Sequence, residues 1–310
     1  MALRWPPAHP GRHMSTDRRA LLGLLGGLAC HSALAQDRPV LVVRHALSQE
    51  QNAKILSYEH AVLTLLLEKT IGSHGPYRLE ASEQVSQNRA FLQLSNGELD
   101  LHSSVTSVTR ERQALPVRVC LYRGLLGLRL PIALRSRAAQ LETVSSLAQA
   151  QALRTGQVAD WPDTQILTAA GWRLERLPRL QPFAEMLRRQ RIDLFALGVI
   201  EVYPIVDALN DLSVLDRWLI AYPSAFYFFV SPRKPALAER LHKAWELVLA
   251  DGSFQTLFEQ TVGAQLARAR LAERLWLRVP NPNLPPDTPL LDGKLWHPLV
   301  RNRLLNPEER

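Results

Sequence analysis

The strongest constraint on the fold of this chain is an alternation between short apolar runs and amphipathic helical segments. Residues 40–45 form a valine-rich apolar run, which is typical of a buried parallel strand. Apolar side chains then recur at helical spacing over residues 58–70. The alternation continues with a strand at 77–80, a helix at 84–94 and a strand at 99–103. This β-α-β-α-β order predicts a parallel sheet flanked by helices.

A second alternation follows the first. It consists of strands expected at 125–134, 172–177, 193–197 and 225–230, with helices at 141–152, 164–170, 183–189 and 203–209. Two further helices, at 235–252 and 254–274, are expected to pack back on the first set. The sequence therefore predicts an α/β protein of two lobes, each a mostly parallel sheet flanked by helices.

The two lobes can be bounded from this pattern. Lobe 1 is predicted to comprise residues 37–126 and 227–275, and lobe 2 residues 127–226. The chain would then cross between them near 124–128 and near 222–226. After these lobes comes a proline-rich tail, residues 276–310, which we expect to be extended because proline cannot lie inside helices or central strands.

The first 35 residues have the features of a secretory signal peptide. Arg18 and Arg19 precede an apolar run that ends at Ala29, and small residues follow at the positions expected before a cleavage site after Ala35. The mature protein would then begin at Gln36 and be exported to the periplasm. Two alternatives stay open: Met14 as the true start, and a lipoprotein anchored through Cys30.

The charge of the chain favours a solvated surface over a nucleic-acid interface. The formal net charge of +8 falls to +5 when the four arginines and one aspartate of residues 1–35 are removed. No later apolar run approaches the roughly 20 residues that cross a bilayer. We therefore expect a soluble monomer, with neither nucleic acid nor stable membrane insertion.

The sequence contains no common catalytic motif. There is no glycine-rich phosphate loop, nucleophile elbow or His-Glu-x-x-His, and the histidines are scattered singly. Cys120 lies in an apolar run, where a buried inert thiol is favoured over a nucleophile. These features predict no metal site, no cofactor and no enzymatic activity.

Residues 97–100 and 107–112 resemble the type II periplasmic binding proteins, and within them the extracellular solute-binding proteins of family 3. The resemblance extends from about residue 40 to 262. It is closest to a subgroup of binding-protein-like sequences that indicates no particular ligand. The shared pattern covers residues 87–89, 116–118, 124–129, 161–164, 166–167, 186–187, 191–193, 201, 228–230 and 251–254.

This resemblance implies a binding site for a ligand that carries a carboxylate. In that family an arginine pairs with the ligand's α-carboxylate while hydroxyl groups complete the cradle. By position, Ser107 and Thr109 match the hydroxyl residues and Arg112 matches the arginine. A planar guanidinium suits a carboxylate because it offers a fork of donors. The alternative is that Arg112 is a solvated residue on a polar loop.

The sequence departs from the family at two places. Family members carry an aspartate, which holds the ligand's α-ammonium, where this chain has Gly198. The Gly-Phe-Asp stretch of the family is replaced here by residues 55–59. Both departures argue against a standard α-amino acid as the ligand.

Four other residues are candidates for the ligand site. Trp161 either stacks on the ligand or packs a turn, and Gln157 and Asp160 share that ambiguity. Glu201 follows an apolar strand and either reaches the cleft or is an ordinary acid at a helix start.

The leading hypothesis is a solute-binding protein that serves an ABC importer or a sensor. The first alternative is a periplasmic dehydratase acting on prephenate-like acids, with Arg112 holding a carboxylate and Glu201 as general acid. The second alternative is a scaffold that has lost ligand binding.

Overall fold

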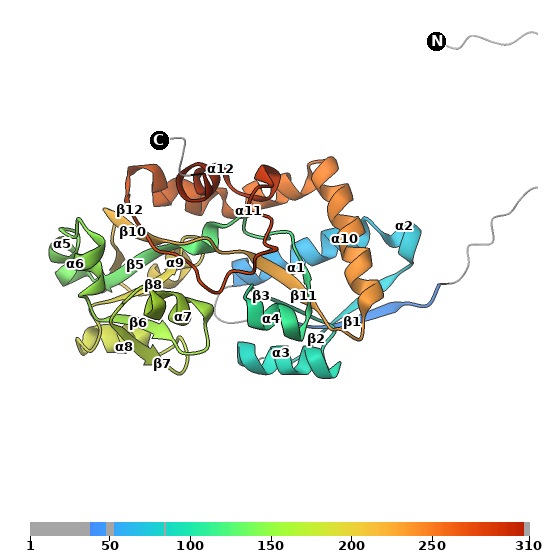
Figure 1. Ribbon diagram of the computed structural model, residues 1–310, viewed down its shortest axis with the longest axis horizontal. Helices are drawn as coiled ribbons and strands as arrows, with labels where there is room; N and C mark the ends of the chain where they lie inside the picture. Colours follow the sequence, from blue (N-terminus) through green and yellow to red (C-terminus); the bar gives the residue numbers. More distant parts are fainter. Residues whose placement is uncertain (1–37, 48–52, 84, 307–310) are drawn as a thin grey trace, which may run out of the picture. The chain divides into compact units, whose positions relative to one another are not determined.

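The structure is a computed structural model that describes residues 38–47, 53–83 and 85–306, without the side chains of 53–57. Residues from Arg38 onward form one compact unit. The predicted signal peptide, with its alternatives at Met14 and Cys30, lies outside the described residues. Figure 1 labels the helices and strands along the chain.

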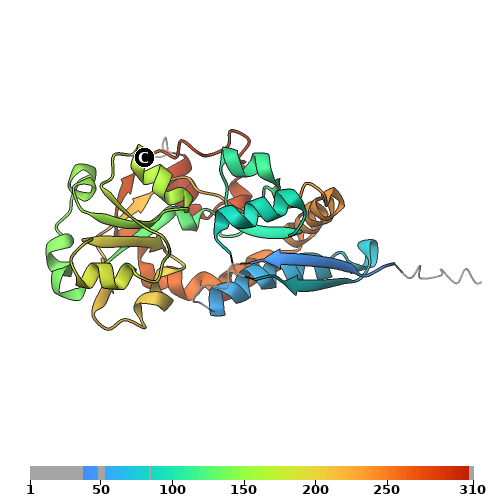
Figure 2. The ribbon, with the colours of Figure 1, turned by 90° about the horizontal axis from the view of Figure 1, so that it is seen from below.

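The described strands form two separate sheets, visible in both ribbon views (Figure 1, Figure 2). The strand order of the first sheet is β2 (Tyr77–Ala81), β1 (Leu41–Ala46), β3 (Leu101–Val105), β11 (Phe226–Val230) and β4 (Leu115–Val117). The second has the order β12 (Leu275–Arg278), β10 (Trp218–Ala221), β5 (Leu128–Leu134), β8 (Leu194–Gly198), β6 (Thr155–Val158) and β7 (Leu174–Leu177), and β9 (Leu212–Val214) also pairs with β5.

Both sheets are mixed, which corrects the prediction of mostly parallel pairing. In the first sheet β1 runs parallel to β2 and β3, but β11 is antiparallel to β3 and β4. In the second sheet β5 is antiparallel to β8, β9 and β10. The reason is connectivity: β11 comes from a chain segment that returns from the second sheet, so it enters the first sheet in the opposite direction.

Helices cover the faces of both sheets. Beside the first sheet lie α1 (Ala53–Glu68), α2 (Ile71–His74), α3 (Gln87–Asn96), α4 (Val108–Gln113) and α10 (Pro235–Ala250). Beside the second lie α5 (Ala138–Leu141), α6 (Leu147–Gln151), α7 (Pro162–Ala169), α8 (Phe183–Arg188) and α9 (Val202–Val206). The long helix α11 (Ser253–Ala269) contacts α1 and α10 before the chain reaches β12.

Local sequence explains several helix ends. The Ser86 hydroxyl accepts a hydrogen bond from the Arg89 amide at the start of α3, and Gly97 ends that helix in the left-handed conformation at φ 76°. Pro162 and Pro235 open α7 and α10, where a missing N–H costs nothing.

The chain passes between the sheets through two segments that lie side by side. The Tyr222 amide donates to the Gly127 carbonyl at 3.1 Å, and the Leu121 amide donates to the Phe226 carbonyl at 2.9 Å. A Cβ on Gly127 would lie 2.1 Å from the Tyr222 carbonyl oxygen, so only glycine permits this approach. The lobe boundaries themselves stay a prediction.

The C-terminal tail is less extended than the sequence predicted. Residues 275–278 form β12, which pairs parallel to β10, and the segment near the end contains helical turns at Gly293–Leu295, Pro298–Val300 and Arg301–Leu305. Trp296 is almost fully buried and packs where the chain crosses between the sheets. The prolines stop long helices, but an apolar side chain can still anchor a short turn on the core.

Candidate functional site

A cavity of about 380 Å³ is lined by residues from both sheets. Four of them stand at the carboxyl ends of strands: Ala46 of β1, Val105 of β3, Val158 of β6 and Leu197 of β8. Open α/β sheets bind ligands beyond the carboxyl ends of their strands. The cavity is therefore the candidate binding site.

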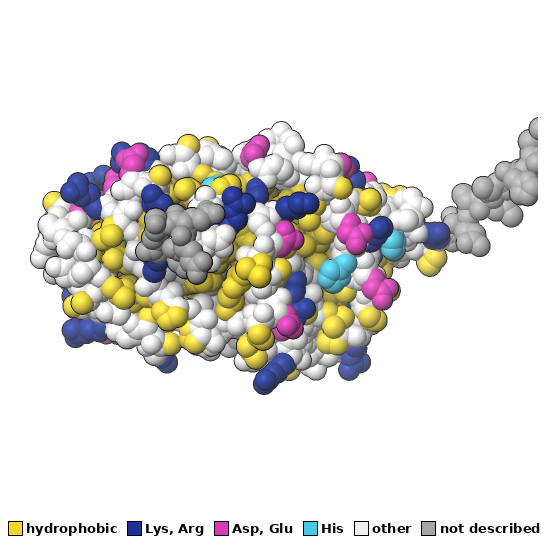
Figure 3. Space-filling model, turned by 45° about the horizontal axis from the view of Figure 1, so that its top comes forward, with side chains coloured by type: hydrophobic (Ala, Val, Ile, Leu, Met, Phe, Trp, Pro, Cys, Tyr) yellow, Lys and Arg dark blue, Asp and Glu magenta, His cyan; other side chains and the backbone are white. Residues whose placement is uncertain are grey.

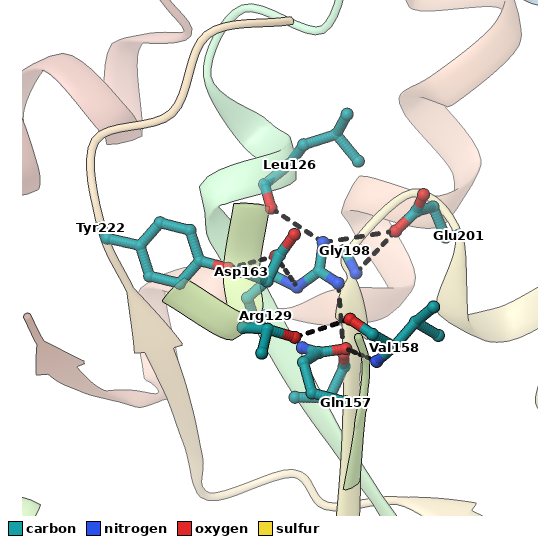
Figure 4. Close-up of polar contacts among 10 residues, drawn as sticks. Leu126, Arg129, Gln157, Val158, Asp163, Gly198, Glu201 and Tyr222 are labelled. Atoms are coloured by element: carbon teal, nitrogen blue, oxygen red, sulfur yellow. Dashed lines mark hydrogen bonds and ion pairs between the residues drawn. The ribbon is translucent and has the colours of Figure 1, made fainter. Parts of the chain in front are cut away.

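Arg129 is the central charge on the β5 side of this cavity (Figure 4). Its side chain is 4% exposed, and its Nε lies 3.2 Å from Asp163 Oδ1. Nη1 donates to the Leu126 carbonyl at 3.3 Å, and Nη2 donates to the Ala196 carbonyl at 3.2 Å. Burial lowers the pKa of Arg129, but the carboxylate of Asp163 more than offsets this, so the guanidinium stays charged.

Asp163 is held by a second partner besides Arg129. The Tyr222 hydroxyl donates to its Oδ1, and both side chains are buried. Burial raises the pKa of Tyr222 well above its usual value, so this hydroxyl keeps its proton and acts as a donor. The ion pair at the cavity wall is thus largely satisfied by the protein itself.

Glu201, just before α9, folds back toward the end of β8. Its Oε2 accepts from the Gly198 amide at 2.9 Å and lies 3.5 Å from Arg129 Nη1. A Cβ on Gly198 would lie 2.7 Å from that same oxygen. Glycine at this position therefore makes room for the carboxylate of Glu201. Burial raises the pKa of Glu201, and Arg129 opposes the shift.

Glu59 of α1 lies on the other side of the cavity, near the first sheet. The carboxyl group is 3% exposed and accepts from the hydroxyls of Ser103 and Tyr122, the latter at 2.9 Å. Burial raises its pKa to about 7, and the nearby Glu201 adds to the shift. Two carboxyl groups thus line one cavity, and within the described residues only Glu201 has a cation, Arg129, at ion-pair distance.

Arg110 is the buried arginine of the α4 region. Its Nη1 donates to Ser104 Oγ at 2.7 Å and to the Val105 carbonyl at 2.8 Å, and its Nη2 donates to Gln87 Oε1 at 2.7 Å. The guanidinium also lies 5.0 Å from the ring centre of Phe91. These contacts occupy the guanidinium in fixing β3 to its neighbours.

The prediction that Arg112 faces the cleft is corrected by the structure. Arg112 is exposed on α4 and does not line the cavity, whereas Arg110 points inward. Residues two apart on a helix lie on nearly opposite faces, so burying one exposes the other. Thr109 is likewise exposed, and Ser107 caps α4 by accepting from the Arg110 amide at 3.3 Å.

The other predicted residues divide into two groups. Asp160, Trp161 and Glu201 line the cavity. Gln157 does not, because it is fully buried at the second sheet and its Oε1 accepts from the Val158 amide. Trp161 lines the cavity, and the centre of its ring lies 6.4 Å from that of Phe195. Its stacking on a ligand stays a prediction.

Sequence reasoning missed most of the polar cavity residues, among them Glu59, His102 and Arg129. A signal was available for Arg129, since it is the only charge in an apolar run of ten residues, 125–134. A lone arginine in a buried strand requires a partner and so indicates a polar site. Glu59 and His102 carry no comparable signal in the sequence.

The described residues offer little for other chemistry. No three His, Cys, Asp or Glu side chains in this part of the chain could together hold a metal ion. Cys120 is buried, and its Sγ accepts from the amides of Gly124 and Phe226. Burial raises the pKa of this thiol, which disfavours the reactive thiolate.

The buried carboxyl of Glu59 should give the empty protein a distinctive pH dependence. The folded state binds its proton with a pKa of about 7, against an ordinary value of 4.5, so the folded state holds more protons between these values. On its own this group lowers stability as pH rises from about 4.5 to 7, whereas the histidines His45, His102 and His297, whose pKa values are lowered to about 4 by burial, act in the opposite direction. Glu59→Gln should therefore shift the slope of Tm against pH toward a steeper rise with pH, whereas the exposed control Glu185→Gln should keep the wild-type slope. Equal slopes for wild type and Glu59→Gln would contradict the assignment.

Solved structures, but no family models or curated proteins, match this chain. Among solved structures, the arginine-specific periplasmic binding protein of Salmonella typhimurium aligns with a TM-score of 0.56 at 11% identity, covering 72% of this chain and 100% of that one. The chain has the type II periplasmic-binding-protein fold.

Two further structures share this type II fold. An ancestral arginine-binding protein bound to arginine has a TM-score of 0.56 at 12% identity, covering 73% of this chain and 99% of that one. A protein described for glutathione import through GshT and a cystine ABC importer of Streptococcus mutans has a TM-score of 0.55 at 13% identity, covering 73% and 96%. These likenesses confirm the predicted two-lobed fold class.

Two further features of the described residues are the distribution of their surface charge and the length of their helices. Lys and Arg side chains lie scattered among acidic and apolar ones on the face shown in Figure 3. None of the helices in the described part of the chain is both long and apolar enough to span a bilayer.

Proposed function

We propose that this protein is an exported solute-binding protein that holds one small polar molecule in the cavity between the two sheets. The observation that carries the proposal is the cavity itself, which lies at strand ends of both sheets and is lined by charged and aromatic side chains. A site built from two lobes can close around its ligand by hinge motion.

The two lobes of the proposed binding protein have the boundaries predicted from the sequence, with one change. We assign the described residues within 37–126 and 227–274 to the first lobe, and residues 127–226 to the second. Strand β12, Leu275–Arg278, is assigned to the second lobe because it pairs with β10. The paired segments around Gly127 and Tyr222 are the proposed hinge.

The cavity chemistry supports binding over catalysis. Arg129 and Asp163 form an ion pair supported by Tyr222, and Glu201 is bonded to the Gly198 amide. Groups held in this way give the cavity a fixed shape and charge, but they are poorly placed to transfer protons to a ligand. We expect an ABC importer or a sensor to bind the protein with its ligand. The similar structure from Streptococcus mutans, which is described with an ABC importer, supports the first of these.

A ligand screen tests this function. The mature chain, mixed with amino acids, amines, organic acids and short peptides, should show a saturable rise in Tm with at least one class. At about 100 times the Kd, a ligand that binds only the folded state adds about 2.7 kcal/mol to the free energy of unfolding. Isothermal titration should then give one site per chain.

The control for the screen is Trp161→Ala, which removes a ring from the cavity wall and should weaken binding, while Thr109→Ala should not. If no compound class shifts the Tm or gives a titration signal, the proposed function is wrong.

A further inference from the structure

The cavity offers free hydrogen-bond acceptors, whereas both terminal nitrogens of its buried arginine are directed at oxygen atoms of the protein. Arg129 directs Nη1 and Nη2 at the carbonyls of Leu126 and Ala196 and Nε at Asp163. Arg110, behind the wall, likewise has both terminal nitrogens bonded to oxygen atoms. In both guanidinium groups the pair of terminal nitrogens that would grip a ligand carboxylate is thus already directed at protein oxygens.

His102 adds an unpartnered, buried acceptor beside the cavity. Its ring lines the cavity and the residue is 6% exposed. Nδ1 contacts the Ala46 carbonyl, which can only accept, so Nδ1 carries the hydrogen. Nε2 is then an acceptor, and it has no partner within the described residues. Burial lowers the pKa of His102 to about 4, so the ring is neutral near pH 7.

The two glutamates also keep acceptor capacity. Each oxygen of Glu59 accepts one hydrogen bond, from Ser103 or Tyr122, although a carboxylate offers about four acceptor sites. The hydrogen bond and the ion pair of Glu201 both use Oε2, and its side chain is 30% exposed. Free acceptors at the cavity therefore come from both lobes.

We propose that the ligand carries a positively charged nitrogen with several N–H groups, an ammonium or a guanidinium, which lies between Glu59 and Glu201. A ligand carboxylate is not required for binding. This inference rests on the proposed function and names the ligand class of the same cavity. A cation supplies the missing donors and offsets the repulsion between two carboxylates that approach from opposite lobes.

The remaining charges around the cavity agree with this assignment. Asp163 is paired with Arg129, and Asp160 lies near Arg110, whose Nη2 approaches the Asp160 carbonyl at 3.5 Å. Arg179 is exposed and lines the cavity, so it is the remaining cation there. An anionic group on a ligand would meet Arg179 at the surface and not the buried carboxyl groups.

Binding of a cation should be linked to a proton. In the empty cavity Glu59 holds its proton up to a pKa of about 7, with Glu201, Tyr122 and Ser103 as its polar neighbours. A cationic ligand favours the ionised carboxylate and displaces that proton. Affinity should therefore rise from about pH 6 to about pH 8, with proton release.

The test uses the full mature chain and small probes of matched length. Agmatine and 1,4-diaminobutane should bind by isothermal titration and raise the Tm, whereas 1,4-butanediol and succinate should not. Arginine shares its guanidinium and carbon chain with agmatine but adds a carboxylate. Agmatine should therefore bind at least as tightly as arginine.

Variants locate the cation. Glu59→Gln and Glu201→Gln should each weaken agmatine binding about 30-fold or more, as expected for removing one member of a buried charge pair. Arg112→Ala should leave it unchanged. Titrations in buffers of different ionisation heat should show proton release for wild type and none for Glu59→Gln. Glu201→Gln provides a second test if Glu59→Gln does not fold.

The outcomes separate the two proposals. Binding of succinate but of neither amine would overturn the cation inference and leave the solute-binding function standing. Unchanged agmatine affinity in both glutamine variants would also overturn it. If no compound of any class binds, the proposed function itself fails.

Discussion

Replacing Arg129 by alanine is expected to destabilise the protein by about 3–5 kcal/mol, because the change leaves buried carboxylates without their partner. Arg129 and Asp163 are both nearly inaccessible to solvent and lie 3.2 Å apart. Glu201 would lose its nearest cation in the same variant. The free energy of unfolding, measured by urea denaturation, reports this loss directly.

The matched control is an exposed arginine with an equally short ion pair. Arg188 contacts Asp211 at 2.7 Å, but both side chains are more than 40% exposed. Arg188→Ala should lower the free energy of unfolding far less than Arg129→Ala does, because solvent screens such a pair. If the two alanine variants are equally stable, the buried ion pair of Arg129 does not stabilise the fold.

Replacing Trp296 by alanine should have an effect of similar size, about 3–5 kcal/mol, although the residue lies in the proline-rich tail. Its side chain is 1% exposed, and its Nε1 donates to the Pro289 carbonyl at 2.8 Å. The ring packs on Gly124, where a Cβ would lie only 2.6 Å from it. The variant would leave a large cavity at the crossing between the sheets, and calorimetry should show a lower Tm.

Leu291 is the control for this second change, because it lies in the same tail and is 95% exposed. Leu291→Ala should alter the free energy of unfolding by no more than about 0.5 kcal/mol. A Trp296→Ala protein as stable as Leu291→Ala would show that the tail is not anchored on the core. The same result would show that Trp296 does not stabilise the segments that cross between the sheets.

The C-terminal tail also contacts helices that lie beside each of the two sheets. The Val108 amide at the start of α4 donates to the Asn283 carbonyl at 3.2 Å, and the Asn283 side chain donates to Gln165 of α7 at 2.9 Å. Arg118 pairs with Asp287 in the tail at 3.6 Å. Composition alone predicted an extended segment, but these contacts fix its path.

The sequence by itself determined the secondary structure of most of the chain. The valine-rich run at 40–45 became β1, and the helical spacing after Pro235 became α10. These signals are local, because the period of apolar residues reflects which face of one element is buried. The order of such elements was also enough to predict the two-lobed fold class.

Only the tertiary structure decided which side chains meet at the cavity. The motif at 107–112 indicated Arg112, but the rotation of a short helix buried Arg110 and exposed Arg112. Glu59 and Glu201 are 142 positions apart in the sequence, yet they line one cavity. Strand β12 likewise joined the second sheet through its pairing with β10. Such pairings depend on the direction and position of whole elements, which no local pattern of residues records.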